Sequence, residues 1–296
     1  MNNIETIQGY KKPIIVAEIG CNHMGDLEIA KNLINLAKDC GADYAKFQKR
    51  TPAELLTEEQ YGTPHPAPHN SYGTTYGEHR EFLEFSIDEH SVLKQYCSEV
   101  GIKYATSVWD VTSAREIGSI SPDYIKIPSA CNNHQELLKV LRDEYEGDVH
   151  VSFGMSTNEE IENLISFYEA NNSAHRLVIY ACTSGYPVPF KDIHLLEISR
   201  LNELYGNRVQ QVGFSGHHLG IAIDVAAYAL GANWIERHFT KDRTWKGTDH
   251  AASLEPAGLS KLVRDLNATH SAVTYKPSEI IEIEKAQREK LKYRPR

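Results

Sequence analysis

Eight short apolar segments recur along the chain, and segments with helical periodicity follow most of them. The strand-length segments cover residues 14–20, 44–48, 104–109, 124–129, 149–154, 177–182, 212–217 and 234–240. The amphipathic segments cover residues 27–40, 88–100, 135–144, 158–170, 221–230 and 256–266. Apolar strands that alternate with helices are typical of a parallel sheet buried on both faces.

Eight strand–helix units within 296 residues favour an α/β fold of the TIM (β/α)8 barrel type, which uses roughly 250 residues as one domain. The competing architecture is an open, doubly wound sheet. Its glycine-rich first turn is missing, because residues 20–25 read GCNHMG rather than GxGxxG. We therefore predict a single barrel domain over residues 1–270, followed by a charged C-terminal tail over residues 271–296.

One connection is much longer than the others. Residues 51–80, after the second predicted strand, contain four prolines and three histidines. Connections of this length are usually lids or binding loops, or else they are mobile. In a barrel this connection would lie on the face that carries the active site.

Composition and charge exclude several classes of protein. The chain has 31 basic and 40 acidic residues and a net charge of −9, so we expect no nucleic-acid or anionic-membrane partner. A local basic pocket for a small anion stays compatible with this balance. No apolar run approaches the roughly 18–20 residues that span a bilayer. The N-terminus lacks the apolar region of a secretory signal.

The cysteines point to a reducing compartment. There are five, at positions 21, 40, 97, 131 and 182, and no CxxC pair occurs. This scatter indicates neither a disulfide framework nor a structural zinc site. We expect small buried side chains in a cytoplasmic protein.

The predicted strands end in polar residues. In chain order these are Glu18, Lys46, Gln48, Thr106, Lys126, Ser129, Ser152, Thr183, Ser184, Ser215, His217, Glu236 and His238. The active site of a TIM barrel lies at the carboxyl ends of its strands. A charged residue inside an apolar strand costs several kcal/mol unless it is paired or liganded. The set therefore predicts an active site.

Two kinds of chemistry follow from these residue types. Lys46 and Lys126, surrounded by hydroxyls, describe a cradle for a phosphate or carboxylate group. His217 and His238, on neighbouring strands, could bind a divalent metal ion whose shell is completed by water or substrate. Asp249, after the last strand, is either a further acid or ligand or a solvated loop residue.

Seven motifs resemble the sialic acid synthase family, whose members make N-acetylneuraminate and related nonulosonic acids from phosphoenolpyruvate. Residues 17–25 read AEIGCNHMG, similar to the family's opening AEIGxNHxG. The other motifs are KFQ at 46–48, YIKIPS at 124–129, SFGMST at 152–157, CTSGYP at 182–187, SGH at 215–217 and ERHFT at 236–240. The resemblance covers residues 10–270.

The resemblance implies a transferase that condenses phosphoenolpyruvate with the open-chain aldehyde of an aldose. Phosphoenolpyruvate would be held by Lys46, Thr106, Lys126, Ser129, Ser152, Ser184 and Ser215. The sugar would be contacted by Gln48, Asn132, Tyr186 and Asp249. His217 and His238 would bind Mn²⁺, with Mg²⁺ or Co²⁺ as alternatives, and Glu18 would act beside it as an acid/base or water-orienting group. The family also implies a homo-oligomer and a role in polysaccharide biosynthesis.

Two departures from the family concern the sugar half of the site. Family members usually have an acidic residue shortly after the serine of the KIxS motif, but residues 129–133 read SACNN. They also have a C-terminal antifreeze-like domain, and residues 287–293 resemble only the linker into it. We therefore expect an intact phosphoenolpyruvate site and an altered acceptor site.

Two other functions stay open at this point. A synthase that uses a phosphorylated aldose, similar to 3-deoxy-octulosonate 8-phosphate synthase, would need additional arginines, for which Arg50, Arg80 and Arg243 are candidates. A non-catalytic barrel that binds sugar or serves as a partner subunit would have lost a site lysine or histidine. The chain has kept both lysines and both histidines, and the acceptor sugar is not readable from the sequence.

Overall fold

Eight parallel strands close into a barrel, in which each strand pairs with its neighbours in sequence and β8 pairs with β1. The computed structural model describes residues 10–294. The strands are β1 (Ile14–Gly20), β2 (Tyr44–Lys49), β3 (Lys103–Val108), β4 (Tyr124–Ile127), β5 (Asp148–Ser152), β6 (Leu177–Cys182), β7 (Gln211–Gly216) and β8 (Trp234–His238). The predicted TIM barrel is thus confirmed.

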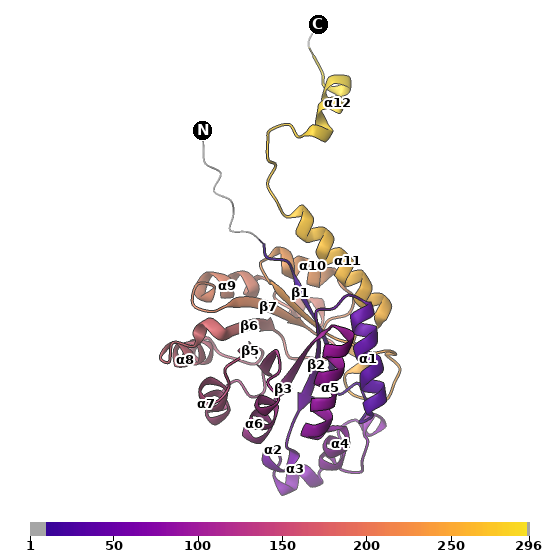
Figure 1. Ribbon diagram of the computed structural model, residues 1–296, viewed down its shortest axis with the longest axis vertical. Helices are drawn as coiled ribbons and strands as arrows, with labels where there is room; N and C mark the ends of the chain where they lie inside the picture. Colours follow the sequence, from indigo (N-terminus) through magenta and orange to yellow (C-terminus); the bar gives the residue numbers. More distant parts are fainter. Residues whose placement is uncertain (1–9, 295–296) are drawn as a thin grey trace.

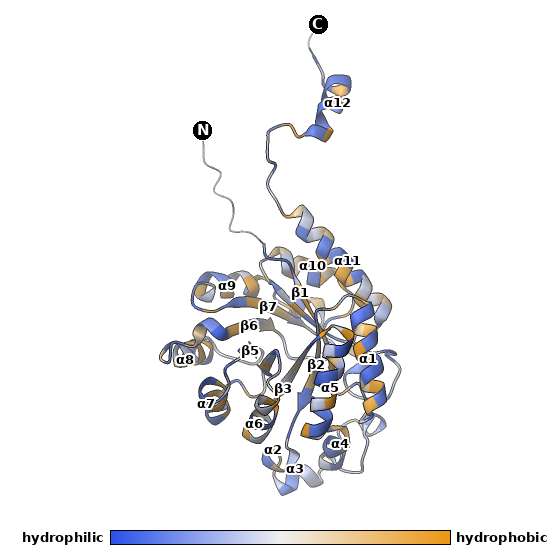
Figure 2. Cartoon of the chain, viewed as in Figure 1, coloured by the Kyte–Doolittle hydropathy of each residue, from blue (hydrophilic) through white to orange (hydrophobic). Residues whose placement is uncertain are grey.

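Helices surround the barrel (Figure 1). They are α1 (Leu27–Asp39), α5 (Ile87–Val100), α6 (Val111–Ser119), α7 (Gln135–Asp143), α8 (Asn158–Glu169), α9 (Leu196–Tyr205), α10 (Ala222–Ala229) and α11 (Pro256–Ala272). Helices α6 and α9 lie in segments for which the sequence pattern predicted no helix. Figure 2 shows that many of these helices combine apolar and polar residues, as expected where one face packs on a sheet. In α7, for example, Leu137, Leu138 and Leu141 are buried.

Side chains that point into the barrel form two levels, because successive residues of a strand face opposite sides. The amino-terminal end of the barrel holds a buried cluster of Val16, Tyr44, Ala105, Tyr124, Val178, Tyr180 and Trp234. Polar residues lie two positions further along several of these strands: Glu18, Lys46, Ser107, Lys126 and Glu236. An aromatic floor therefore closes one end of the barrel, and the polar residues lie above it.

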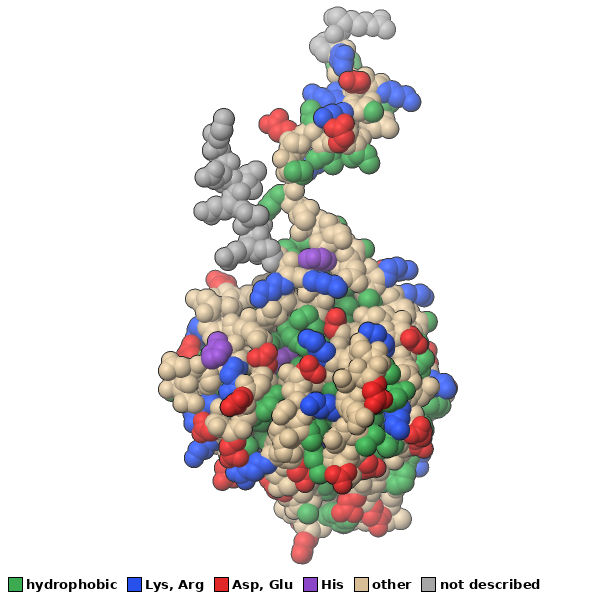
Figure 3. All heavy atoms as spheres, in the orientation of Figure 1, with side chains coloured by type: hydrophobic (Ala, Val, Ile, Leu, Met, Phe, Trp, Pro, Cys, Tyr) green, Lys and Arg blue, Asp and Glu red, His purple; other side chains and the backbone are tan. Residues whose placement is uncertain are grey.

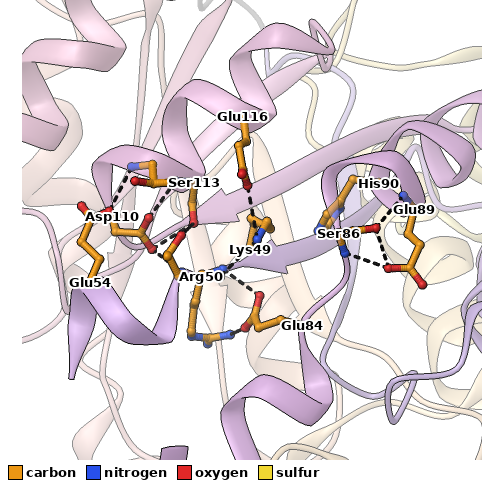
Figure 4. Close-up of polar contacts among 12 residues, drawn as sticks. Lys49, Arg50, Glu54, Glu84, Ser86, Glu89, His90, Asp110, Ser113 and Glu116 are labelled. Carbon is orange, nitrogen blue, oxygen red and sulfur yellow. Dashed lines mark hydrogen bonds and ion pairs between the residues drawn. The ribbon is translucent and has the colours of Figure 1, made fainter. Parts of the chain in front are cut away.

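The long connection after β2 is folded into short helices. These are α2 (Pro52–Leu55), α3 (Glu58–Gly62) and α4 (Tyr76–Leu83). Its beginning is fixed to α6, because Glu54 accepts hydrogen bonds from the backbone N–H groups of Val111 and Thr112 at 3.0 and 3.3 Å (Figure 4). At its far end the Tyr72 hydroxyl donates to the carbonyl of Lys246, in the connection after β8. The connection therefore spans the mouth of the barrel.

The C-terminal residues extend away from the barrel as α12 (Glu282–Leu291), which has no buried residue (Figure 1). Figure 3 shows charged side chains of both signs on α12 and on the visible face of the barrel. The division at residue 270 and the linker role of the tail stay predictions. Within residues 10–294, no helix has both the length and the apolar character needed to cross a membrane. All five cysteines are free thiols, and three of them are buried.

Candidate active site at the carboxyl ends of the strands

A cavity of about 620 Å³ opens at the carboxyl ends of the strands. Twelve of the predicted site residues line it: Glu18, Lys46, Gln48, Lys126, Ser129, Ser152, Ser184, Tyr186, Ser215, His217, His238 and Asp249. The structure therefore brings together side chains from six strands and the connections that follow them. Thr106 and Asn132 do not line the cavity, and each has a different role.

The bottom of the cavity, which lies above the aromatic floor of the barrel, is a buried network of two lysines and two carboxylates. Lys46 Nζ lies 2.5 Å from Glu18 Oε2 and 3.7 Å from Glu236 Oε2. Lys126 Nζ donates a hydrogen bond to Glu236 Oε1 at 2.6 Å, and Ser215 Oγ donates to the same oxygen at 3.1 Å. All four charged side chains are at most 6% exposed. Charges buried this deeply are stable only when they are paired, as they are here.

Glu236 was among the polar residues noted in the predicted strands, but the sequence assigned it no role. Burial raises the pKa of Glu236, but Lys126 and Lys46 outweigh this effect and lower the pKa to about 2. The carboxylate is therefore ionised at neutral pH. Burial lowers the pKa of Lys126, and Glu236 opposes this change. Glu236 thus helps Lys126 to stay charged in a buried site.

Thr106 corrects one expectation about β3. Its hydroxyl donates to the Tyr104 hydroxyl at 2.7 Å and is fully buried on the outer side of the strand, where His90 of α5 contacts Tyr104. Ser107, the next residue, faces inward and accepts a hydrogen bond from Lys46 Nζ at 2.7 Å. The sequence presents a hydroxyl at both positions, so composition did not show which one points into the barrel.

Asn132 also lies outside the cavity. Its amide donates to the carbonyl of Ser152 at 3.0 Å and to Ser156 Oγ at 2.7 Å, so it ties the connection after β4 to the connection after β5. Ala130, two residues earlier, lines the cavity instead. The cavity thus has a methyl group in the segment where the resemblance implies a polar contact with the sugar.

Gly154 allows three serine-bearing segments to meet. A Cβ at this position would lie 2.4 Å from Ser184 Oγ and 2.7 Å from Ser129 Oγ, far inside van der Waals contact. The backbone N–H of Gly154 donates to Ser129 Oγ at 3.0 Å. The absence of a side chain therefore places two hydroxyls and a backbone donor at one side of the cavity.

His217 and His238 face each other across the β7–β8 edge, with ring centroids 5.5 Å apart. His217 Nδ1 is 3.3 Å from the carbonyl oxygen of Thr183. A carbonyl only accepts, so Nδ1 carries the hydrogen and the lone pair of Nε2 is available. Burial, assisted by His238, lowers the pKa of His217 to about 3, and the ring is therefore neutral at physiological pH.

These imidazoles fit a metal ion that has few protein ligands. His238 Nδ1 is buried without a hydrogen-bond partner in the described part of the chain. Residues 10–294 contain no group of three or more His, Cys, Asp or Glu side chains arranged to hold a metal ion. A divalent ion bound here would therefore have two imidazole ligands and would take its other ligands from water and substrate oxygens.

A buried arginine on the outer side of β8 positions the two histidines. Arg237 Nη1 lies 2.5 Å from Asp224 Oδ2 and donates to the carbonyl of Gly220 at 2.8 Å. His218 Nε2 lies 3.2 Å from the same Asp224 oxygen. This cluster joins β8 to the connection after β7, so it fixes the strand ends that carry His217 and His238.

The upper part of the cavity is formed by polar residues of β2 and of the long connection. Gln48 Nε2 donates to Glu18 Oε1 at 2.6 Å, and Arg50 Nη2 donates to Gln48 Oε1 at 2.6 Å. Arg50 also pairs with Glu84 at 3.3 Å (Figure 4) and stacks on Trp109, whose ring centroid is 3.6 Å away.

The three arginines considered for a phosphorylated acceptor divide between two places. Arg50 and Arg80 line the cavity. Arg243 lines a separate pocket beside Glu255 and donates to the carbonyl of Ala251. The structure thus brings two of the three arginines to the cavity, a selection that no sequence pattern predicted.

Comparisons with known proteins indicate one family. A model of the NeuB family matches residues 33–277. The N-acetylneuraminate-9-phosphate synthase of Homo sapiens is 38% identical over 285 residues, which is 96% of this chain and 78% of the relative. The N,N'-diacetyllegionaminic acid synthase of Campylobacter jejuni is 31% identical over 264 residues, which is 89% of this chain and 78% of the relative.

Solved structures show the same similarity. A crystal structure of an N-acetylneuraminic acid synthetase from Leptospira borgpetersenii superimposes with a TM-score of 0.81 at 28% sequence identity and covers 97% of this chain and 94% of the other. The match of the family model over most of the barrel and the identity to the human synthase lead to one conclusion. The chain belongs to the NeuB family, the family of the sialic acid synthases.

Proposed function

We propose that this protein condenses phosphoenolpyruvate with the open-chain form of an aldose to give a 3-deoxy-ulosonic acid and inorganic phosphate. The observation that carries the proposal is the buried pair Lys46 and Lys126, ringed by serines, beside the imidazoles of His217 and His238. A substrate with a phosphate and a carboxylate needs cations and hydrogen-bond donors at two points. The names of the relatives support the same reaction.

The lysines and serines would hold phosphoenolpyruvate at the floor of the cavity. Lys46 and Lys126 supply the positive charge, and the hydroxyls come from Ser107, Ser129, Ser152, Ser184 and Ser215. In the reaction, carbon 3 of phosphoenolpyruvate forms a bond to the aldehyde carbon, and the aldehyde oxygen takes up a proton. Water adds at carbon 2 and loses one proton, which balances the proton taken up by the aldehyde oxygen. The C–O bond to phosphate then breaks, phosphate leaves with the second proton of that water, and carbon 2 becomes a ketone.

His217 and His238 would hold a divalent ion, Mn²⁺ in our proposal with Mg²⁺ or Co²⁺ as alternatives, which would supply Lewis-acid polarisation of the aldehyde oxygen. Glu18 accepts a hydrogen bond from Gln48 and lies against Lys46. These contacts fix its carboxylate at the cavity floor, where it would orient the attacking water. Tyr186, whose ring centroid is 4.4 Å from that of His217, and Asp249 would contact the sugar.

The non-catalytic alternative has no support in the arrangement of the cavity. A barrel that only binds a partner has no need for two buried ion pairs under a cavity of this size. We propose small-molecule substrates and a cytoplasmic homo-oligomer. Some of the relatives' names include a phosphate and others do not. Both phosphorylated and unphosphorylated sugars therefore belong among the acceptors to be tested.

The test is release of phosphate from phosphoenolpyruvate in the presence of Mn²⁺ and a panel of acceptors: hexoses, pentoses, N-acetylated hexosamines and sugar phosphates. We expect release that depends on one acceptor class and stops when EDTA is added. His217→Ala should abolish turnover and weaken Mn²⁺ binding measured by calorimetry, with an unchanged circular dichroism spectrum. His175→Ala, at an exposed histidine, is the matched control. Full activity in His217→Ala would contradict the metal site.

A further inference from the structure

We propose that Asn22, in the turn after β1, is a positioning residue that holds His238 and Asp249 in the geometry that the reaction needs. Asn22 is 1% exposed and is not one of the residues that line the cavity. The inference rests on the proposed function where it concerns the metal ion and the sugar. Three observations support it: the direction of the Asn22 amide, the connection that this amide closes, and the turn that carries it.

The side-chain amide of Asn22 donates both of its hydrogens. Nδ2 donates to the carbonyl oxygen of Phe239 at 2.9 Å and to Ser253 Oγ at 2.9 Å. A carbonyl only accepts, and the Ser253 hydroxyl gives its single hydrogen to the carbonyl of Asp249 at 2.7 Å. Both contacts therefore need a donor, and this requirement fixes the orientation of the amide.

The two partners of Asn22 lie at opposite ends of the connection after β8. Phe239 begins this connection directly after His238, and Ser253 lies near its other end. The backbone also brings the two ends together, because the N–H of Leu254 donates to the carbonyl of His238 at 2.7 Å. Asn22 holds both ends from the side of β1, so it closes the connection into a loop of fixed shape.

This closure acts on two side chains that line the cavity, His238 and Asp249. The bond from Asn22 to the Phe239 carbonyl fixes the backbone directly after His238. The Ser253 hydroxyl passes the restraint on to the backbone of Asp249. A single buried amide thus positions a proposed metal ligand through one branch and a proposed sugar contact through the other. Groups that orient a metal ligand in this way commonly matter almost as much as the ligand itself.

The turn after β1 explains why a side chain makes these contacts. The pairing of β1 with β8 extends as far as Glu18 and His238. At Gly20 the backbone turns away with a φ of +56°, a conformation that favours glycine. The backbone N–H of Asn22 then donates to the carbonyl of Ile19 at 2.9 Å, which tightens the turn. The Asn22 amide therefore continues the contact with β8 where the backbone of β1 no longer runs beside it.

The experiment measures Mn²⁺ affinity and acceptor kinetics separately. Asn22→Ala should raise the Kd for Mn²⁺, measured by calorimetry, and should lower kcat/KM for the aldose. We expect each change to be roughly 10- to 100-fold, the usual effect of removing a group that orients a metal ligand. The KM for phosphoenolpyruvate should stay close to that of the wild type, because Lys46 and Lys126 are held by other contacts.

Ser253→Ala tests the branch to Asp249 alone. This variant removes the hydroxyl between Asn22 and Asp249 and leaves the bond from Asn22 to Phe239 in place. The KM for the aldose should rise roughly 10-fold, the effect of about one hydrogen bond, with an unchanged Kd for Mn²⁺. A wild-type KM for the aldose in this variant would overturn the branch to Asp249, even if Asn22→Ala does not fold.

Asn202→Ala is the matched control, because Asn202 Nδ2 also donates to two carbonyls, those of Ile198 and Gly231, at 2.9 and 3.4 Å. Gly231 precedes β8, so these bonds lie at the opposite end of the barrel. The control should unfold at a lower urea concentration than the wild type, with unchanged Kd for Mn²⁺ and unchanged KM values. The same result for Asn22→Ala would mean that Asn22 only stabilises the fold, and would overturn the inference.

Failure of the proposed function would be recognised separately. In that case the wild type would release no phosphate with any acceptor, but the Mn²⁺ titrations would still decide whether Asn22 positions His238. Absence of Mn²⁺ binding in the wild type would overturn the metal site, and this inference with it.

Discussion

The two ends of the barrel are built from the same strands but hold different side chains. At the amino-terminal end, the ring centroids of Tyr124 and His150 are 3.6 Å apart, and that of Trp234 is 4.5 Å from His150. Two residues further along β4 and β8 lie Lys126 and Glu236, which form an ion pair. A distance of roughly 7 Å along each strand therefore separates an aromatic floor from a charged cavity.

This difference separates stability from chemistry within one fold. The floor excludes water by packing, and its aromatic rings bury large apolar areas. The charged network contributes less to stability, since replacing a buried ion pair by apolar residues is often neutral. We therefore expect substitutions at the aromatic floor to change mainly unfolding. Substitutions in the charged network of the cavity should change mainly turnover, provided that they leave no buried charge without its partner.

The largest effect should come from Lys126→Met. Loss of this cation should lower kcat/KM roughly 100- to 1000-fold, measured by phosphate release. It also leaves Glu236 with only the more distant Lys46, which should destabilise the protein by roughly 3–5 kcal/mol. The double variant Lys126→Met/Glu236→Met should regain most of that stability in urea unfolding but not the activity. Recovery of both together would mean that the charges are structural only.

Trp234→Ala should show the opposite pattern to the double variant. Removing a buried indole from the floor should cost roughly 3–5 kcal/mol of unfolding free energy, measured by urea denaturation. Kinetics at low temperature, where the variant stays folded, should show KM for phosphoenolpyruvate close to that of the wild type. Trp234→Phe is the control and should lose much less stability. A large rise in KM with little loss of stability would contradict the division between a stabilising aromatic floor and a catalytic cavity.

The floor should also make stability depend on pH through His150. Burial holds the pKa of His150 well below its ordinary value of 6.5. Between these two values the unfolded chain binds a proton that the folded chain does not, so stability falls as the pH drops below about 6.5. One such histidine contributes about 1.4 kcal/mol per pH unit. Urea unfolding between pH 7.5 and 5.5 should show that the free energy of unfolding depends less on pH in His150→Phe than in the wild type. An unchanged pH dependence would show that His150 is not its cause.

The smallest effect tests which face of β3 takes part in catalysis. Ser107→Ala removes the hydroxyl that accepts a hydrogen bond from Lys46 and should lower kcat/KM by roughly 10-fold, the effect of about one hydrogen bond. Thr106→Val, on the outer face, should change kcat/KM less than twofold and cost about 1 kcal/mol of stability. The reverse order of the two activities would place Thr106 at the substrate.

Much of the barrel was readable from the sequence because strand and helix periodicities differ clearly. The polar strand ends identified Lys46, Lys126, His217 and His238, since such residues are rare in apolar strands. The direction of a side chain was less certain where adjacent residues are both polar, as at Thr106 and Ser107.

Contacts between residues that are far apart in the sequence could not be predicted from sequence patterns. Asn132 lies after β4 as predicted, but its amide binds the backbone of Ser152 rather than the cavity. The helices of residues 51–80 depend on hydrogen bonds to α6 and to the connection after β8. The pairing of Arg50 with Glu84 joins residues 34 positions apart.

The buried ion pairs at the cavity floor make the site selective among cellular anions. An anion that reaches Lys46 or Lys126 must displace the attraction of Glu18 or Glu236, which are already in contact. A monovalent ion such as chloride or acetate carries a single charge, so we expect it to compete poorly with carboxylates that are already in contact with the lysines. A ligand with several negative charges, which engages both lysines and the serines at once, overcomes this competition. The carboxylates therefore act as a threshold that keeps abundant small anions from blocking the enzyme.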